Sequence, residues 1–128
     1  MRNTAIAAIL VLSLSACGAT TQRPDTGGNR NLITLLEIQA APNPSMNLWD
    51  FIAGARPHFL RDRGVGSFQN TTPVTAVVYL DGNMLGDIRS LRSISLSSVQ
   101  LIEYMSGPDA TTRYGMGHGG GAILLKSH

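Results

Sequence analysis

The sequence predicts an α+β fold: a small mixed β-sheet of four or five strands with one main helix and one or two short helices. Aliphatic and β-branched runs recur between turn residues, and the 128 residues include 14 glycines and 6 prolines. One longer segment has apolar residues at helical spacing. With 43% hydrophobic and 14% charged residues, the chain has the composition of a globular protein, and its length suits one domain.

The N-terminus has the features of a bacterial lipoprotein signal peptide over residues 1–16. A positive start at Arg2 precedes an apolar run of about ten residues, too short to span a bilayer. Leu14-Ser15-Ala16-Cys17-Gly18 resembles the lipobox, where cleavage leaves a cysteine that takes up diacylglycerol and a further acyl chain such as palmitate. Cys17, the only cysteine, is therefore the predicted lipid-attachment residue. The alternative is an ordinary secretory leader with an incidental cysteine.

Gly18 occupies the position after the cysteine, where an aspartate often marks retention at the inner membrane. Its presence there favours the outer membrane and a domain that faces the periplasm.

Residues 17–31 are predicted to be the lipidated cysteine and a flexible linker. From residue 19 this segment is polar and rich in turn residues, and it has no apolar period. Thirteen residues of this composition reach about 20 Å. The folded domain, residues 32–128, would therefore stay near the membrane and be free to turn.

The first part of the domain is predicted to hold the main helix. Residues 32–34 form a short apolar strand, whereas the pattern at 35–38 does not decide between helix and strand. Ser45 is the expected N-cap of the helix, and Pro57 should end or bend it. Trp49 lies beside the apolar face as a core or rim aromatic residue. That face is formed by Leu48, Phe51, Ile52, Ala55 and Phe59.

The middle of the domain is predicted to begin the sheet. A short strand is expected at 65–68, and the β-branched run at 74–80 is the predicted sheet centre, covered on both faces. Asp81-Gly82 should turn the chain into a strand at 83–85, after which Gly86-Asp87 should turn it again. Asp87 is also expected to cap a short turn that carries Ile88 and Leu91.

Two further strands, at 99–105 and 122–125, are expected to complete the sheet. Between them, Gly107-Pro108 should start a short helix, and Gly115 should end it in a left-handed conformation. The glycine-rich residues 117–121 are expected to loop around His118.

The chemistry-bearing residues lack the spacing of a catalytic or metal site, so the chain is predicted not to be an enzyme and to use no cofactor. The segment at 117–121 has the residues of an esterase oxyanion-hole loop, Gly-His-Gly-Gly-Gly, but the sequence has no Gly-x-Ser-x-Gly nucleophile turn. We therefore favour a structural interpretation, in which a glycine-lined turn lets the last strand pack closely. A net charge of +2 offers no patch for nucleic acid. The histidines are too far apart in the sequence for a metal-binding motif: His58, His118 and His128. Four acidic residues are each explained by a turn or by solvation: Asp81, Asp87, Glu103 and Asp109.

Three segments together resemble the plug domain of TonB-dependent outer-membrane receptors. Val77-Val78-Tyr79-Leu80-Asp81-Gly82, then residues 98–115, then Gly120-Gly121-Ala122-Ile123 are similar to the family's V-Y-hydrophobic-D-G, I-E-x-I-E-V-x-x-G-P-x-x-x-x-Y-G and G-G-x-I patterns. The resemblance covers roughly residues 32–126 and is strongest over 74–126. It implies a plug-domain-like fold. It also implies structural roles for the motif residues Tyr79, Asp81, Gly82, Glu103, Gly107, Pro108, Tyr114, Gly115, Gly120 and Gly121.

The resemblance also sets the expected function. Plugs of that family lie inside a barrel of about 22 strands, and at about ten residues a strand such a barrel needs several hundred residues, so transport by this chain alone is not expected. We expect a non-enzymatic outer-membrane lipoprotein that acts as an interaction or accessory module in envelope transport. Its partner would be an outer-membrane barrel, a TonB-type protein or a second copy. The alternative is a periplasmic domain that binds a small ligand in the loops around 82–86 and 115–121. A hydrolase that uses His118 and a receptor fragment rank below these.

Overall fold

A five-stranded mixed sheet forms the centre of the domain, which confirms the α+β prediction. In this computed structural model the described residues are 29–63, 65–67 and 70–128. The predicted signal peptide, Cys17 and most of the predicted linker therefore lie outside the described residues. The strands follow the order β1-β6-β7-β4-β5, with β4 and β7 parallel and the other pairs antiparallel. They are β1 (Leu32–Ile33), β4 (Val77–Leu80), β5 (Asn83–Asp87), β6 (Val99–Met105) and β7 (Ala122–Ser127).

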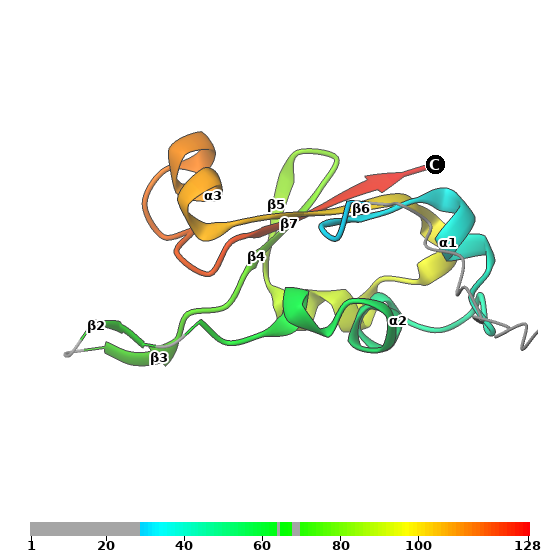
Figure 1. Cartoon of the computed structure of the whole chain (residues 1–128), viewed down its shortest axis with the longest axis horizontal. Helices are drawn as coiled ribbons and strands as arrows, with labels where there is room; N and C mark the ends of the chain where they lie inside the picture. Colours follow the sequence, from blue (N-terminus) through cyan, green and yellow to red (C-terminus); the bar gives the residue numbers. More distant parts are fainter. Residues whose placement is uncertain (1–28, 64, 68–69) are drawn as a thin grey trace, which may run out of the picture.

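Helical segments lie on both sides of this sheet (Figure 1). α2 (Leu48–Ala55) lies below it in that view, and three 3₁₀ turns belong to the same layer: η1 (Pro57–Leu60), η2 (Ile88–Ser93) and η3 (Leu96–Ser98). α3 (Gly107–Tyr114) lies above the sheet near one end, and α1 (Leu35–Gln39) lies at the other end. The chain ends close to α1, on β7.

The two faces of the sheet are covered unequally. Because successive side chains of a strand point to opposite faces, alternate residues of β4, β6 and β7 enter the layer shared with α2 and the 3₁₀ turns. Val78, Ile102 and Ile123 are fully buried there, in the main core. The opposite face holds a smaller cluster of Tyr79, Ala110 and Ala122 beneath α3, with Val77, Met105, Tyr114 and Leu124 packed against it. The second face is thus partly open.

The main helix starts later than predicted. Its N-cap is Asn47 rather than Ser45, because the side-chain oxygen of Asn47 accepts a hydrogen bond from the backbone N–H of Asp50 at 2.9 Å, and its amide donates to the Asp50 carboxylate at 2.9 Å. Ser45 instead donates its backbone N–H to the Asn43 side chain. The helix ends before Pro57 as predicted, so Phe59 reaches the core from η1.

The prediction that the run at 74–80 forms the sheet centre is wrong. Only Val77–Leu80 is a strand, and β7 is the central strand, between β6 and β4. The prediction of a turn at Gly86-Asp87 is also wrong, because β5 continues through both residues. The register between β4 and β5 shifts between Val78 and Tyr79, and Gly86, which pairs with Val78, adopts a φ of +128° at this irregularity. Local pattern does not reveal either feature, since both depend on strands that pair across the chain.

Several elements lie where the sequence predicts them. β6 matches its expected range, and β1 is one residue shorter than expected because Thr34 caps α1. Pro108 lies in the first turn of α3, and Gly115 ends that helix with a φ of +89°. Asp87 caps η2 by accepting the Arg89 backbone N–H at 2.9 Å. The strand at 65–68 is present as β2 (Val65–Ser67), but its partner β3 (Asn70–Pro73) was not predicted, because Asn-Thr-Thr-Pro has no apolar alternation. These two strands form a separate ribbon.

Candidate functional site

Three aromatic side chains from distant segments meet on the partly open face of the sheet. Tyr79 comes from β4, Tyr114 ends α3, and His118 lies in the loop that follows α3. The Tyr79 and Tyr114 rings stack at 4.5 Å between centroids, with 18° between their planes, and the His118 ring lies 6.0 Å and 5.6 Å from them. We call this group the aromatic site.

Hydrogen bonds fix both ring nitrogens of His118. Its Nε2 lies 2.8 Å from the Tyr79 hydroxyl and its Nδ1 lies 2.9 Å from the carbonyl oxygen of Gly115. A carbonyl only accepts, so Nδ1 carries the proton, and in the neutral ring Nε2 accepts the hydrogen bond from the Tyr79 hydroxyl. Both side chains are buried, at 7% exposure each. The histidine therefore joins β4 to the loop after α3.

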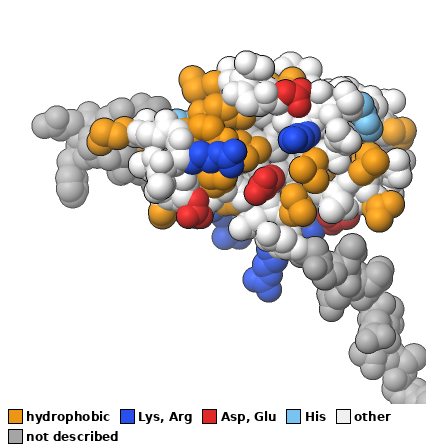
Figure 2. Space-filling model, turned by 90° about the horizontal axis from the view of Figure 1, so that it is seen from above, with side chains coloured by type: hydrophobic (Ala, Val, Ile, Leu, Met, Phe, Trp, Pro, Cys, Tyr) orange, Lys and Arg blue, Asp and Glu red, His pale blue; other side chains and the backbone are white. Residues whose placement is uncertain are grey.

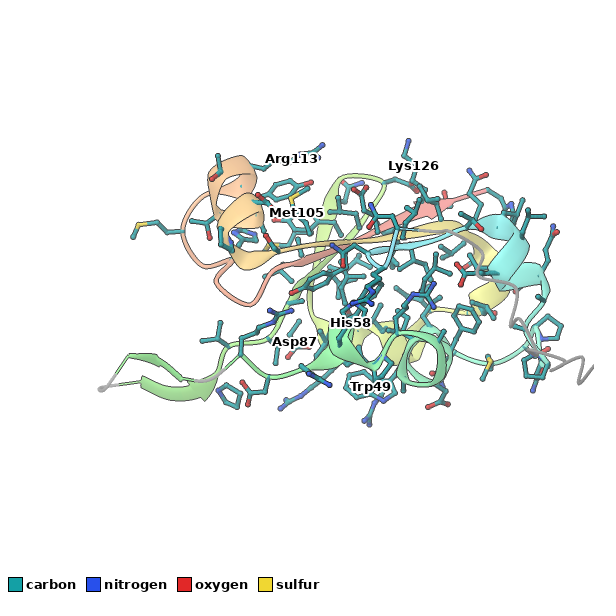
Figure 3. All side chains as sticks on the ribbon, viewed as in Figure 1. Trp49, His58, Asp87, Met105, Arg113 and Lys126 are labelled. Atoms are coloured by element: carbon teal, nitrogen blue, oxygen red, sulfur yellow. The ribbon has the colours of Figure 1, made fainter. Side chains whose placement is uncertain are left out.

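A cavity of about 180 Å³ lies beside the aromatic site. Its walls come from β4 and its turn, from the strands β6 and β7, and from the end of α3. Arg113 and Lys126 lie on this side of the sheet (Figure 3), and Figure 2 shows the same face, where single basic and acidic side chains lie among apolar and neutral ones. The lining residues are Tyr79, Asp81, Gly82, Leu101, Glu103, Arg113, Tyr114, Leu124, Leu125 and Lys126.

The charges around the cavity differ in how they are held. The Asp81 carboxylate accepts the Ser127 hydroxyl at 2.6 Å and the Ser127 backbone N–H at 3.1 Å, and these hydrogen bonds lower the pKa of Asp81. The Arg113 guanidinium lies 5.4 Å from the centre of the Tyr114 ring. Glu103 and Lys126 are exposed, and within the described residues neither makes an ion pair. The rim thus offers two basic groups and one unengaged carboxylate.

The structure brings half of the ten plug-motif residues to this cavity: Tyr79, Asp81, Gly82, Glu103 and Tyr114 all line it. Gly107 and Pro108 start α3 and Gly115 ends it. Gly120 lies against the backbone of Thr75, where a β-carbon would overlap the Thr75 carbonyl, and Gly121 lies against Met105 and Tyr104. The latter glycines therefore let the chain enter β7 close to its neighbours.

His118 is the member of the site that the sequence analysis did not place. It was treated as a residue inside a glycine-rich turn, because its partner Tyr79 lies 39 residues away. No local signal links the two side chains. Both ring nitrogens are hydrogen-bonded within the protein, so the contacts of His118 are accounted for by a structural role in holding the loop on β4.

The other histidines lie elsewhere. His58 packs at 4.7 Å from the Phe59 ring below the sheet, and its pKa is lowered by burial first and then by nearby arginines, Arg56 before the others. His128 ends the chain. Within residues 29–63, 65–67 and 70–128, no three histidine, cysteine, aspartate or glutamate side chains come together as a metal site, and no helix there has the length and apolar character to span a membrane.

Comparisons with known proteins identify the fold. No protein-family model and no curated protein matches the sequence. Among solved structures, the chain is similar to the siderophore receptor PirA from Pseudomonas aeruginosa, at 24% identity and a TM-score of 0.48. It is also similar to a mutant of the ferric enterobactin receptor PfeA from the same organism in complex with enterobactin, at 20% identity and a TM-score of 0.50.

Both similarities cover 76% of this chain but only 17% of the receptor chain. At these identities the similarity indicates a shared fold and does not indicate a shared activity. The match to the ferric enterobactin receptor is consistent with the plug-like fold that the sequence motifs imply. The domain thus shares its fold with a small part of the ferric enterobactin receptor.

Proposed function

We propose that this chain is a non-enzymatic, lipid-anchored module of the bacterial outer membrane whose plug-like domain binds a partner protein in envelope transport. The observation that carries the proposal is the convergence of five plug-motif residues on one cavity of the partly open sheet face. The structural likeness to part of a siderophore receptor supports the same interpretation. The lipid anchor is supported by the lipobox around Cys17.

The size of the cavity favours a protein partner over a small ligand. Small-molecule pockets usually enclose about 300–1,000 Å³, whereas this cavity holds about 180 Å³. It suits one or two side chains of a partner that lies across the sheet face. Partly buried Leu101, Met105 and Leu124 provide apolar contact area, while Arg113 and Lys126 lie near its edge. The partner is an outer-membrane barrel, a TonB-type protein or a second copy of this chain.

Site-specific crosslinking in the native membrane tests this surface. A photo-crosslinking residue replaces Lys126, which is exposed on the cavity face, and in a matched chain it replaces Asp50, which is exposed on α2 below the sheet. We expect Lys126 to capture one envelope protein or a second copy, and Asp50 not to capture it. No adduct from Lys126, or equal adducts from both positions, would contradict a partner at this face. A thermal shift with a panel of metabolites and siderophores then examines the small-ligand alternative.

Labelling with a palmitate analogue tests the anchor separately. Wild-type chain should take up the label and sediment with outer membrane, whereas Cys17→Ser should not be labelled. Two acyl chains or more are needed for stable anchoring, because a single chain binds only reversibly. Label that persists in Cys17→Ser would show that the lipid is attached elsewhere, and a wild-type chain without label would show that no lipid is attached.

A further inference from the structure

A second site lies on the opposite side of the sheet, between α2, η2 and the segment after β3. It is a cavity of about 340 Å³, almost twice the volume beside the aromatic site. Figure 3 shows Trp49 and Asp87 below the sheet, whereas Arg113 and Lys126 lie above it. The lining residues are Trp49, Pro73, Thr75, Asp87, Ile88, Arg89 and Arg92.

The core of this second site is an arginine that stacks on the only tryptophan of the sequence. The guanidinium carbon of Arg92 lies 4.6 Å from the centre of the Trp49 ring. A guanidinium over an indole ring is attracted by the electron-rich ring face and can still donate its N–H groups to an acceptor. Within the described residues, no carboxylate lies within ion-pair distance of Arg92. Arg92 is thus an exposed cation over the Trp49 ring that has no carboxylate partner among the described residues.

The one carboxylate of the cavity does not cancel its positive charge. Asp87 already caps η2 by accepting the Arg89 backbone N–H, and its contact with the Arg89 guanidinium is long, at 3.9 Å. The side chains of Arg89 and Asp87 are 85% and 53% exposed, so this pair is weak and screened. Two guanidinium groups against one engaged carboxylate leave the cavity with an excess of positive charge.

We propose that the Trp49–Arg89–Arg92 cavity docks the domain on the phosphate headgroups of an anionic phospholipid surface. Arginine donates paired hydrogen bonds to phosphate oxygens, and tryptophan concentrates at the depth of the headgroups because its ring is apolar and its N–H is polar. Basic side chains are attracted to an anionic leaflet, but this attraction decays within about one Debye length of the surface. The domain must therefore be held close to the membrane. A linker that reaches about 20 Å from an acylated Cys17 does this.

The proposal rests on the acyl anchor of the proposed function and adds an orientation to it. A domain that docks through the lower face shown in Figure 1 turns the aromatic site and its cavity away from that membrane. The partner-binding face is then presented to the periplasm. Lipid docking and partner binding therefore use opposite sides of one sheet.

Emission of the single tryptophan reports directly on the cavity. The full acylated chain is reconstituted into vesicles of phosphatidylcholine alone and into vesicles that also contain phosphatidylglycerol. We expect a blue shift of Trp49 emission, with quenching by headgroup-labelled lipid, only where phosphatidylglycerol is present, and loss of both in high salt. Arg89→Ser leaves the Trp49–Arg92 stack in place and should lower the ratio of docked to undocked domain about fivefold. The Arg89→Ser/Arg92→Ser chain should lower it about 25-fold.

The matched control removes the same charge from the other face. Arg113→Ser/Lys126→Ser should keep the phosphatidylglycerol-dependent shift at the wild-type level, because neither side chain borders the Trp49 cavity. Equal Trp49 emission in both vesicle types, or equal loss of the shift in the control chain, would overturn the proposal. A shift caused by soluble glycerol phosphate would assign the cavity to a free anion, and one caused by an acidic peptide would assign it to a protein. Chain that fails to float with vesicles of either composition would instead contradict the acyl anchor.

Discussion

Removal of a single hydroxyl from the aromatic site should destabilise the domain measurably. Tyr79→Phe keeps the ring that stacks on Tyr114 but removes the donor to His118 Nε2. His118 is buried, and its other ring nitrogen is bonded to Gly115, so the ring has no simple way to turn Nε2 toward water. The substitution therefore leaves a buried acceptor without a partner.

The expected cost follows from that lost partner. A net hydrogen bond contributes about 1 kcal/mol, and an unsatisfied buried polar group costs about 1–3 kcal/mol, so we expect the free energy of unfolding to fall by about 2 kcal/mol. This corresponds to a drop of about 30-fold in the folding equilibrium constant. With a urea m-value of about 2 kcal/mol/M, the unfolding midpoint should move down by about 1 M.

Urea unfolding at neutral pH measures this shift, and the chain offers a matched control. The Tyr114 hydroxyl makes no hydrogen bond within the described residues, so Tyr114→Phe removes the same atom from the stacked partner ring and should change the free energy of unfolding by less than about 0.5 kcal/mol. If Tyr79→Phe and Tyr114→Phe unfold at the same urea concentration, the hydrogen bond from Tyr79 does not hold the loop, and the aromatic site is only a stack of rings.

Two further substitutions test the close approach at β7 and the acid behaviour of the cavity rim. Gly120→Ala should cost about 3 kcal/mol in unfolding free energy because its β-carbon meets the Thr75 backbone, whereas Gly54→Ala, with open space around it in α2, should stabilise by about 0.5–1 kcal/mol. Equal effects in thermal unfolding would refute the tight entry into β7. The hydrogen bonds from Ser127 lower the pKa of Asp81 in the folded state, so they stabilise the fold above the ordinary value of 3.8, and that stabilisation is lost as pH falls through the lowered pKa. Asp81→Asn should therefore melt below wild type at neutral pH and converge with it in acid; a constant difference across that range would contradict this role.

Local signals were sufficient for much of the fold. Pro108 and Gly115 mark the two ends of α3, and the β-branched and aliphatic run of β6 matches its strand. Asp87 caps η2 as its position before an apolar turn predicts. Each of these features depends on residues within one turn of the chain, where backbone preference and short hydrogen bonds decide the outcome.

The errors arose where a nearby competitor or a distant strand decided the outcome. Asn47 replaced Ser45 as the helix cap because its side chain exchanges two hydrogen bonds with Asp50. The run at 74–80 was predicted to be the sheet centre because it is β-branched and almost continuously apolar, but β7 is the central strand, since it pairs in parallel with β4 and antiparallel with β6. Pairing order depends on loop closures over tens of residues, and local composition carries little information about them.

The sequence by itself predicted an α+β domain, the two ends of α3 and the cap of η2, and it carries the motifs that resemble a receptor plug and a lipobox around Cys17. The tertiary structure alone decided which of these residues meet. His118 bonds Tyr79 across 39 residues, and Arg92 stacks on Trp49 from a different element. The physical reason is the range of the interactions: propensities and caps act within a few residues, whereas a site is made by side chains that only the packing of the sheet brings within contact distance.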